Sequence, residues 1–410
     1  MPAAQAADLD ATMGVTHPAE EHLLLDKPAD LYDAFRTRTH QALNEQGIHF
    51  GAGYAMTVLG NPAGGAHQGA TYSGLFGAGL DFDFGHWFDW TDAVLRVSGS
   101  WAGGDSLSEE YIHNAIDVSN VFSGRAVRLY ELSLRDTFFD DALELRFGRL
   151  SVGARFGISP LSDAFVNLSF NENLAALSYN DPAFVTDPVS VWGMTASWEP
   201  KHSNWRARLG IFDASDPDQW NQDTSGIDFS FDPGAGVLLV GEVETRTPEG
   251  LPLLPRPAHL ALGFFVDTGK RPVLGTEDEE KQGNYNLWLT MEQSVATFRD
   301  EADDLSAFLT FVGAPQASLN TFLFSTTGGL VWRGWHPARP QDAWALGVAY
   351  YQFSKDLPGQ SYEMAIDFAY TWVVNSWLRV QPDIQGVIRP DGRSGVPNAL
   401  VVGFAADVTF

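Results

Sequence analysis

The strongest constraint on the fold of this chain is an alternation of apolar with small or polar residues that recurs along most of its length. In residues 50–58, for example, Phe50, Tyr54 and Met56 fall on alternate positions, and glycine, alanine or threonine lies between them. Because successive side chains of a β-strand point to opposite faces, this pattern predicts a strand with one apolar and one polar face. No apolar run approaches the roughly 20 residues that an α-helix needs to cross a bilayer. If the chain spans a membrane, it must therefore do so as a barrel.

The alternating runs have the length of tilted strands that cross a bilayer, about ten to fifteen residues. We predict about sixteen of them, at residues 48–59, 70–85, 90–102, 125–138, 142–153, 188–199, 204–213, 236–247, 257–268, 283–294, 305–313, 320–334, 343–354, 361–374, 377–389 and 398–410. Short turns on one side, at 86–89, 139–141, 200–203 and 375–376, alternate with long outward connections, at 103–124, 154–187 and 214–235. Outer-membrane barrels show this segregation of loop lengths, whereas a β-sandwich or propeller has no reason to show it.

The sequence therefore predicts an all-β fold, a transmembrane antiparallel up-and-down β-barrel over residues 48–410, located in the bacterial outer membrane. Before the barrel, residues 29–47 predict a short amphipathic helix on the periplasmic side that ends at Gly47. Residues 1–28 lack any periodicity and are expected to form a mobile arm. Ala4-Gln5-Ala6 has the form of a signal-cleavage site, so we expect an exported protein whose signal has been removed.

Composition and chain ends agree with this fold. Aromatic residues make up 13% of the chain, which has 40 glycines and no cysteine, as suits export through an oxidising compartment. The net charge of −27 argues against a nucleic-acid partner, because phosphate neutralisation requires basic patches. Aromatic clusters such as 87–90 and 332–335 fall at strand ends, as interfacial girdles do. Phe410 closes the last strand on its apolar face, where outer-membrane barrels commonly carry an aromatic that their assembly machinery recognises.

Short segments in a characteristic order and spacing lie between residues 142 and 270. They are Leu145–Leu150, Arg155–Gly157, Phe165–Leu168, Asp187–Gly193, Gly210–Ala214, Gly236–Val243 and Gly263–Lys270. Together they resemble the OprB family of carbohydrate-selective porins, as does the Gly-Ile-His-Phe sequence that leads into the first strand. The C-terminal third fits the family mainly in its pattern. The resemblance implies a sixteen-stranded barrel that passes monosaccharides such as glucose into the periplasm by passive, saturable diffusion.

The phase of each strand predicts which charged side chains point into the lumen. If the apolar face meets lipid, the inward residues on neighbouring strands of one wall are Arg96, Glu131, Arg135, Glu144, Arg146, Arg206, Arg208, Glu242 and Glu244. Arg149 falls out of phase after Gly148; a bulge there would turn it inward, and we include it in the pore lining. Guanidinium groups donate several hydrogen bonds and carboxylates accept them from hydroxyls, so together they can replace the hydration shell of a sugar. The alternative is that these charges only keep the pore wet and pair with one another.

The long connection at 154–187 is the second predicted element of the pore. Loops of this length in a compact domain tend to be functional. We predict that it folds inward and narrows the lumen, with Arg155 and Asn167 among the lining residues. A loop that projects into solvent is the alternative.

Other function classes find little support. The sequence contains no Gly-x-Ser-x-Gly, His-Glu-x-x-His or Gly-x-x-x-x-Gly-Lys motif, so we expect no catalytic residue and no cofactor. Asp213, Asp216, Asp218 and Asp223 miss the spacing of a calcium loop, and no metal site is predicted. A nonselective or anion-preferring porin is the main alternative, and an outer-membrane barrel enzyme or a soluble β-rich lectin is less favoured. The expected partners are small sugars, outer-membrane lipid and lipopolysaccharide, and the assembly machinery that reads Phe410; the pattern leaves monomer and homotrimer open.

Overall fold

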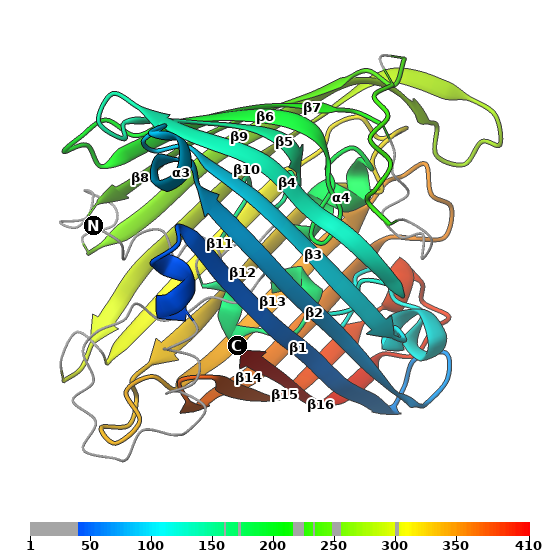
Figure 1. The fold of residues 1–410 in the computed structure, drawn as a ribbon. Helices are drawn as coiled ribbons and strands as arrows, with labels where there is room; N and C mark the ends of the chain where they lie inside the picture. The colour runs from blue at the N-terminus through cyan, green and yellow to red at the C-terminus, as the bar shows by residue number, and fades with distance from the viewer. Residues whose placement is uncertain are drawn as a thin grey trace.

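The chain forms one closed antiparallel barrel, in a computed structural model that describes residues 40–159, 161–170, 174–215, 225–232, 234–247, 256–299 and 303–410 (Figure 1). The strands found in these residues number sixteen, each pairs with its neighbours in sequence, and β1 pairs with β16 to close the ring. The predicted fold class, strand number and strand order are confirmed.

The strands tilt strongly against the barrel axis, as closure requires (Figure 1). They are β1 (Ile48–Ala63), β2 (Ala70–Asp83), β3 (Val94–Gly104), β4 (Ala126–Phe138), β5 (Leu143–Leu150), β6 (Val191–Trp198), β7 (Trp205–Asp213), β8 (Val237–Thr247), β9 (Ala258–Pro272), β10 (Glu280–Thr297), β11 (Asp304–Gly313), β12 (Phe322–Arg333), β13 (Ala343–Phe353), β14 (Tyr362–Asn375), β15 (Leu378–Ile388) and β16 (Ala399–Thr409).

Two departures from the predicted boundaries have physical causes. The β9–β10 hairpin is longer than predicted, because Lys270–Pro272 pair with Glu280–Gln282 although this polar stretch has no apolar face that a sequence pattern can detect. In contrast, β5 ends at Leu150 rather than at residue 153, because the chain leaves the wall there and enters the lumen.

Short helical pieces punctuate the connections. They are α3 (Phe84–Phe88), the single π-helical turn η1 (Ser108–Ile112), η2 (Ser162–Ala164), η3 (Leu168–Phe170), α4 (Ala175–Asn180) and η4 (Pro390–Gly392). Of the predicted helix at 29–47, residues 40–44 are helical and Gly47 has a positive φ of 71°; the remainder, like the predicted arm at 1–28, lies outside the described residues. Among the helices that the structure describes, none is long and apolar enough to cross a membrane.

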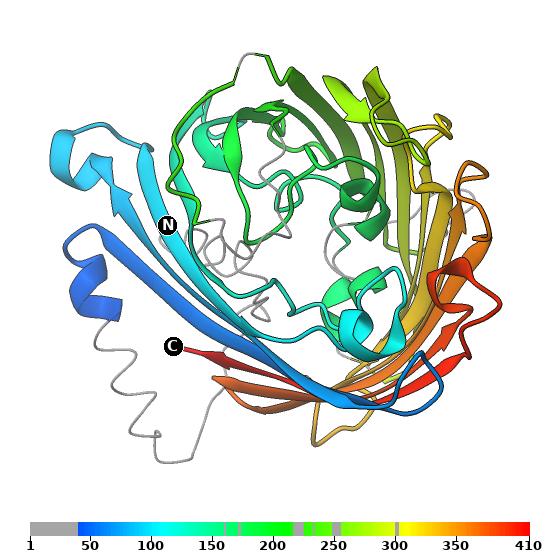
Figure 2. The ribbon, with the colours of Figure 1, turned by 90° about the vertical axis from the view of Figure 1, so that its right-hand side faces the viewer.

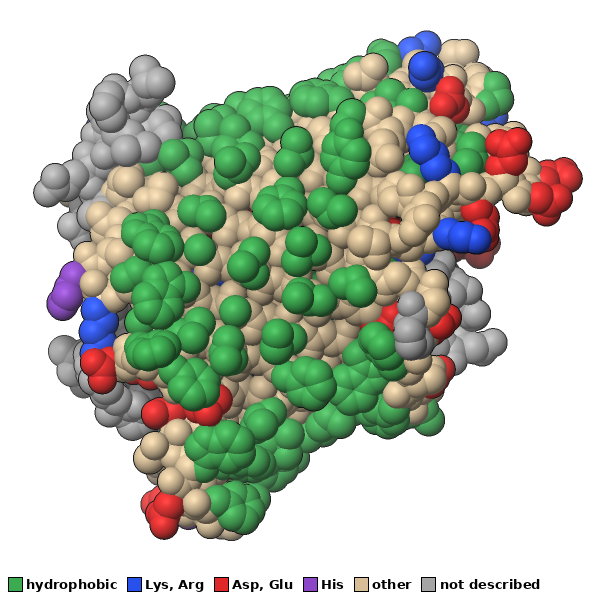
Figure 3. All heavy atoms as spheres, turned by 90° about the horizontal axis from the view of Figure 1, so that it is seen from above, with side chains coloured by type: hydrophobic (Ala, Val, Ile, Leu, Met, Phe, Trp, Pro, Cys, Tyr) green, Lys and Arg blue, Asp and Glu red, His purple; other side chains and the backbone are tan. Residues whose placement is uncertain are grey.

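The outer face of the barrel is apolar across its middle. Outward side chains such as Phe147 and Leu262 are exposed, whereas their sequence neighbours point inward and are buried. Figure 3, which views the side that carries β6 and β7 in Figure 1, shows apolar side chains spread over the wall and charged ones gathered toward its two ends. This is the surface that a strand barrel presents to lipid.

The hydrophobic core of the protein lies inside the barrel. Figure 2, which looks along the barrel, shows coils and short helices of two long connections within the ring of strands. Phe165 and Phe170 stack on each other at a centroid distance of 4.7 Å, and Phe165 contacts Phe308 of β11 at 5.6 Å. Phe184 contacts Phe265 of β9 at 5.7 Å. Much of the lumen is therefore filled, and the open path is narrower than the ring.

Candidate functional site: the charged lumen and its inward connections

The connection 151–190 crosses the lumen and is held there by carboxylates of the wall. The backbone N–H of Gly157 donates to Glu242 of β8 at 2.9 Å, and the hydroxyl of Ser159 donates to Glu292 of β10 at 2.6 Å. Farther along, the backbone N–H of Asn167 donates to Asp367 of β14 at 2.8 Å. The predicted inward fold of this connection is confirmed. These three hydrogen bonds are buried and together define its position.

A second connection, 105–125, also folds inward; it is one of the long connections predicted for the outer side of the barrel, and no inward fold was predicted for it. Its backbone N–H groups at Ala115 and Ile116 donate to Glu363 of β14 at 2.8 and 3.1 Å. The N–H of Leu168 donates to the carbonyl of Asp117 at 3.1 Å and joins the two connections. Burial favours this inward fold: Leu107, Ile112 and Val118 pack against inward apolar side chains of β1, β15 and β16.

Buried carboxyl groups within these connections have perturbed pKa values. Burial raises the pKa of Asp117 to about 6, although hydrogen bonds from Ser106 and Ser119 oppose this shift. Burial likewise raises the pKa of Asp187 to about 6, against the hydrogen bond that it accepts from the Tyr130 hydroxyl. The plug formed by the two connections is therefore expected to respond to mild acidification.

One cluster of charges joins β4, β5 and the inward connection. Arg146 lies 3.1 Å from Glu131 and 3.5 Å from Glu144. Arg155 lies 3.1 Å from Glu131, and Arg135 lies 3.8 Å from Glu144. All five belong to the predicted lining, and Glu131, shared by two guanidinium groups, is at the buried centre of the cluster.

A second cluster lies on β7, β8 and β9. Arg208 lies 2.5 Å from Glu242 and 3.0 Å from Glu244, and Arg206 lies 3.2 Å from Glu244. His259 of β9 lies 3.3 Å from Glu244 and links it to the next strand. Sequence phase identified the arginines and glutamates. His259 was not predicted, although its alternation with the apolar Leu260 and Leu262 places it on the inward face by the same rule.

Two of the predicted lining residues, Arg96 and Asn167, mainly stabilise the fold through contacts with neighbouring strands. The guanidinium of Arg96 forms a two-pronged contact with Asp81 of β2, with both hydrogen bonds at 2.8 Å, and both side chains are buried. Asn167 donates its side-chain amide to Gln385 of β15 at 2.7 Å and is also buried. Each faces inward, but each is enclosed by its partners.

Arg149 does not lie where the sequence analysis placed it. No register shift interrupts the pairing of residues 143–150 with β4 and β6, and Arg149 stands opposite Leu132 and Trp192. Residues directly opposite in neighbouring strands share a face, and Trp192 stacks on the exposed ring of Phe147 at 5.8 Å. The bulge expected after Gly148 does not form, so Arg149 stays on the outer side and we leave it out of the pore lining.

The opposite wall carries charges that the sequence analysis did not select. Arg333 of β12 lies 2.7 Å from Asp163 of the inward connection, and Arg379 of β15 lies 3.8 Å from the same carboxylate. Arg379 also lies 3.0 Å from Asp407 of β16. The signal was present, because Arg379 alternates with the apolar Leu378 and Val380.

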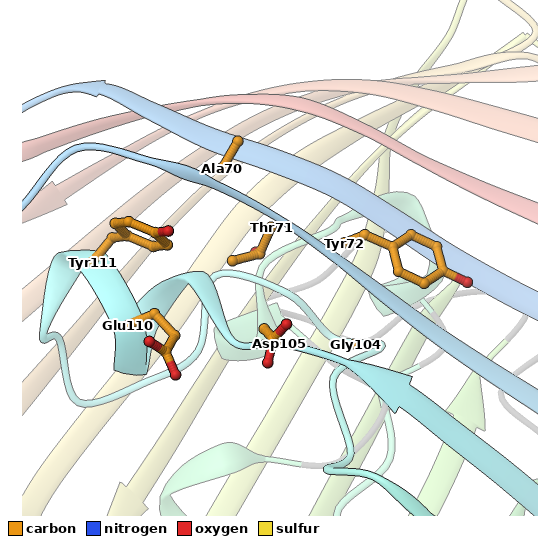
Figure 4. A pocket seen from close by; sticks show the side chains of 7 residues that line it. All are labelled: Ala70, Thr71, Tyr72, Gly104, Asp105, Glu110 and Tyr111. Atoms are coloured by element: carbon orange, nitrogen blue, oxygen red, sulfur yellow. The ribbon is translucent and has the colours of Figure 1, made fainter.

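A hollow lies at the rim of the barrel, where β2 begins and β3 ends, and its lining includes two tyrosines and two carboxylates (Figure 4). Its lining residues are Ala70, Thr71, Tyr72, Gly104, Asp105, Glu110 and Tyr111. Asp105 there pairs with Arg125. The described part of the chain contains no group of three or more His, Asp or Glu side chains placed to hold a metal, and Asp216, Asp218 and Asp223 of the acidic loop lie outside it.

A closed sixteen-strand barrel with an apolar outer band and a charged, partly filled lumen defines an outer-membrane porin. The model of the family described as "Carbohydrate-selective porin, OprB family" matches residues 67–410, and the chain belongs to that family. The match extends well beyond the segments that carry the resemblance in the sequence.

Individual relatives agree with this assignment. Porin B of Pseudomonas aeruginosa is 24% identical over 412 residues, which cover 90% of this chain and 88% of that protein. The high-pH structure of Pseudomonas putida OprB superimposes with a TM-score of 0.83 at 25% identity, covering 92% of this chain and 97% of that one. The low-pH structure of the same porin has a TM-score of 0.61 at 20% identity, covers 93% and 97%, and shows the fold alone. The protein is thus a carbohydrate porin of the bacterial outer membrane.

Proposed function

We propose that this porin passes monosaccharides of glucose-like size by passive, saturable diffusion, and that its two charged clusters form the stretch that contacts the sugar. The observation that carries this proposal is the set of partly exposed charges beside the inward connection. Their side chains are 18% exposed for Arg135, 29% for Glu144, 14% for Arg155, 30% for Arg206 and 15% for Arg208. These five are the residues that we assign to sugar contact.

The remaining charges act by positioning. The side chains of Arg146 and Glu131 are each 2% exposed, and that of Glu242 is 1% exposed, so a passing solute does not touch them. They fix the exposed guanidinium groups in place, because each carboxylate accepts from two or more donors. A sugar that enters trades water hydrogen bonds for charge-assisted ones, each worth roughly 1.5–3 kcal/mol. Release requires that this exchange be nearly balanced.

Charge balance favours a neutral solute over an anion. The two clusters hold five arginines and four glutamates, and His259 lies between Glu244 and a fifth carboxylate, Glu292. A nearly neutral wall offers both donors and acceptors, as sugar hydroxyls require, without the net positive field that draws anions. A general anion-preferring porin remains the competing function.

Liposome swelling separates these functions. We expect vesicles that contain the purified porin to swell faster in glucose than in gluconate, which has the same carbon number but carries a charge. Disaccharides should enter more slowly than glucose because of their size. Equal or faster entry of gluconate would contradict the proposed preference, and vesicles with heat-denatured porin control for leakage.

The location in the outer membrane also suggests partners for this porin, namely the barrel assembly machinery, lipopolysaccharide and other copies of the chain. We infer that assembly uses the C-terminal residue: the N–H of Phe410 donates to the carbonyl of Ala52 at 2.9 Å, which seats it against β1. Its ring is 38% exposed and lies 6.3 Å from Phe76 on the outer face, within reach of an assembly factor. Deletion of Phe410 should lower the amount of folded porin in outer membranes without changing its synthesis. Lipopolysaccharide contact and the choice between monomer and homotrimer are tested by crosslinking in native membranes.

A further inference from the structure

The barrel wall is lowest at three neighbouring strands. β5 and β6 have 8 residues each and β7 has 9, whereas β9 has 15 and β10 has 18. Eight residues at about 3.4 Å each, tilted by about 40°, reach a height of only roughly 20 Å. The apolar band of such barrels is about 25 Å tall. The lipid-facing surface of the wall is therefore short near the outer end of β5 and β6.

Residues 225–232, which we call the strap, lie against the outer side of this low wall. The backbone N–H of Leu129 donates to the carbonyl of Ser225 at 2.8 Å. Below the strap, Arg149 donates to the carbonyl of Asp228 at 2.9 Å, and the indole of Trp192 donates to the carbonyl of Phe229 at 3.0 Å. These donors belong to β4, β5 and β6, and the latter two are outward-facing side chains. The wall thus holds the strap by its backbone carbonyls.

The apolar side chains of the strap are exposed, whereas its carboxylates bond to the chain itself. Ile227 is 66% exposed, Phe229 47% and Phe231 57%, on alternate positions. The carboxylates between and after them are turned back onto the chain: Asp228 accepts from the N–H of Ser230 at 2.9 Å, and Asp232 accepts from the N–H of Gly234 at 2.8 Å. Because the wall binds the carbonyls and the chain binds the carboxylates, the described part of the structure leaves much of the surface of these three large apolar side chains uncovered.

We propose that the strap lies in the outer leaflet of the membrane, with Ile227, Phe229 and Phe231 among lipid acyl chains. The argument is continuity: Phe229 contacts Trp192 at 6.2 Å, and Trp192 stacks on Phe147, an exposed side chain of the lipid-facing wall. The strap extends that apolar surface where the strands are too short to do so. Burial of large apolar side chains in lipid supplies the driving force.

The strap is also tied to the pore. The guanidinium of Arg149 donates both to Asp228 of the strap and, at 2.5 Å, to the carbonyl of Ser190, the last residue of the inward connection. Arg149, which is not part of the pore lining, therefore links the strap to the end of the inward connection. We therefore expect lipid contact at the strap to make the end of the inward connection more rigid.

Single cysteines test the proposal cleanly, because the chain has no cysteine of its own. Ile227→Cys and Phe229→Cys are each labelled with an environment-sensitive fluorophore and reconstituted into vesicles with or without lipids that carry a nitroxide on the acyl chain. Phe147→Cys on the lipid-facing wall is the positive control, and Asp278→Cys in the exposed connection 273–279 is the solvent control. Folding of each variant is checked by its gel mobility before and after boiling.

We expect the strap labels to lose emission to the nitroxide lipid to the same degree as the label at residue 147. The Asp278→Cys label should lose little. Strap labels that behave like Asp278→Cys would overturn the proposal, since the segment would then lie in water. Disulfide-linked pairs of Phe229→Cys porin in native membranes, without quenching, would overturn it in favour of contact between copies of this chain.

Discussion

Glu242 is the residue whose change should most sharply alter the constriction. It accepts from three donors, namely the N–H of Gly157 at 2.9 Å, Arg208 at 2.5 Å and the indole of Trp288 at 2.7 Å. Glu242→Gln keeps the shape of the side chain and removes its charge. Charge-assisted hydrogen bonds contribute about 1.5–3 kcal/mol and neutral ones about 0.5–1.5 kcal/mol, so each contact weakens by about 1 kcal/mol. The three contacts, to the inward connection, Arg208 and Trp288, together lose about 3 kcal/mol.

Single-channel recording in planar bilayers measures the consequence. We expect Glu242→Gln to raise the mean conductance, increase current noise and weaken the block of ion current by glucose, because the connection 151–190 loosens at its contact with β8. Glu279→Gln in the exposed connection 273–279 is the matched control, and it should leave all three unchanged. If Glu242→Gln porin folds but has the same conductance and block as the wild type, the connection is not held by this carboxylate and the reasoning fails.

The remaining predictions concern the same lumen. Arg208→Ala should weaken glucose block about tenfold, the equivalent of about 1.4 kcal/mol, whereas the outward Leu209→Ala should leave block unchanged; equal effects in both would mean that inside and outside are wrongly assigned. Phe165→Ala removes a ring buried against Phe170 and Phe308 and should destabilise the plug by about 3–5 kcal/mol, seen as faster proteolysis between residues 151 and 190; wild-type protection would refute this. The folded-state pKa of Asp117 is raised to about 6 from about 3.8, so its contribution favours the folded state below about pH 4 and is lost as the pH rises through about 6, by up to about 3 kcal/mol. Asp117→Asn should flatten this part of the pH dependence of the melting temperature, and an unchanged profile would count against it.

The wall of the barrel could be predicted from the sequence because the alternation of residues within each strand shows which of its faces meets lipid and which meets the lumen. Period-two alternation gives the number of strands, their order and the face that each side chain occupies. That is why Arg146 and Arg208 could be placed inside from their neighbours alone. Arg379 obeys the same rule, because the apolar Leu378 and Val380 flank it.

The interior could not be predicted to the same depth, because it is built from non-local contacts. Nothing within residues 105–125 shows that Glu363, far along the chain, accepts the N–H groups of Ala115 and Ile116. The phase of its own strand already places Arg149 outside; whether a bulge reverses this depends on the register against Leu132 and Trp192, which one strand alone does not reveal. Nor does phase distinguish a charge that touches solute from one that its partner encloses, as Asp81 encloses Arg96.

Glucose titration of single-channel current tests the central claim most directly. A pore whose exposed arginines and glutamates bind the sugar in passing should lose ion current along a saturable curve, with a half-blocking concentration that Arg208→Ala raises. A current that falls only in linear proportion to the viscosity of the sugar solution, identically in wild type and variant, would mean that sugar passes without contact. That result would contradict the assignment of the charged clusters as the sugar-binding stretch of this porin.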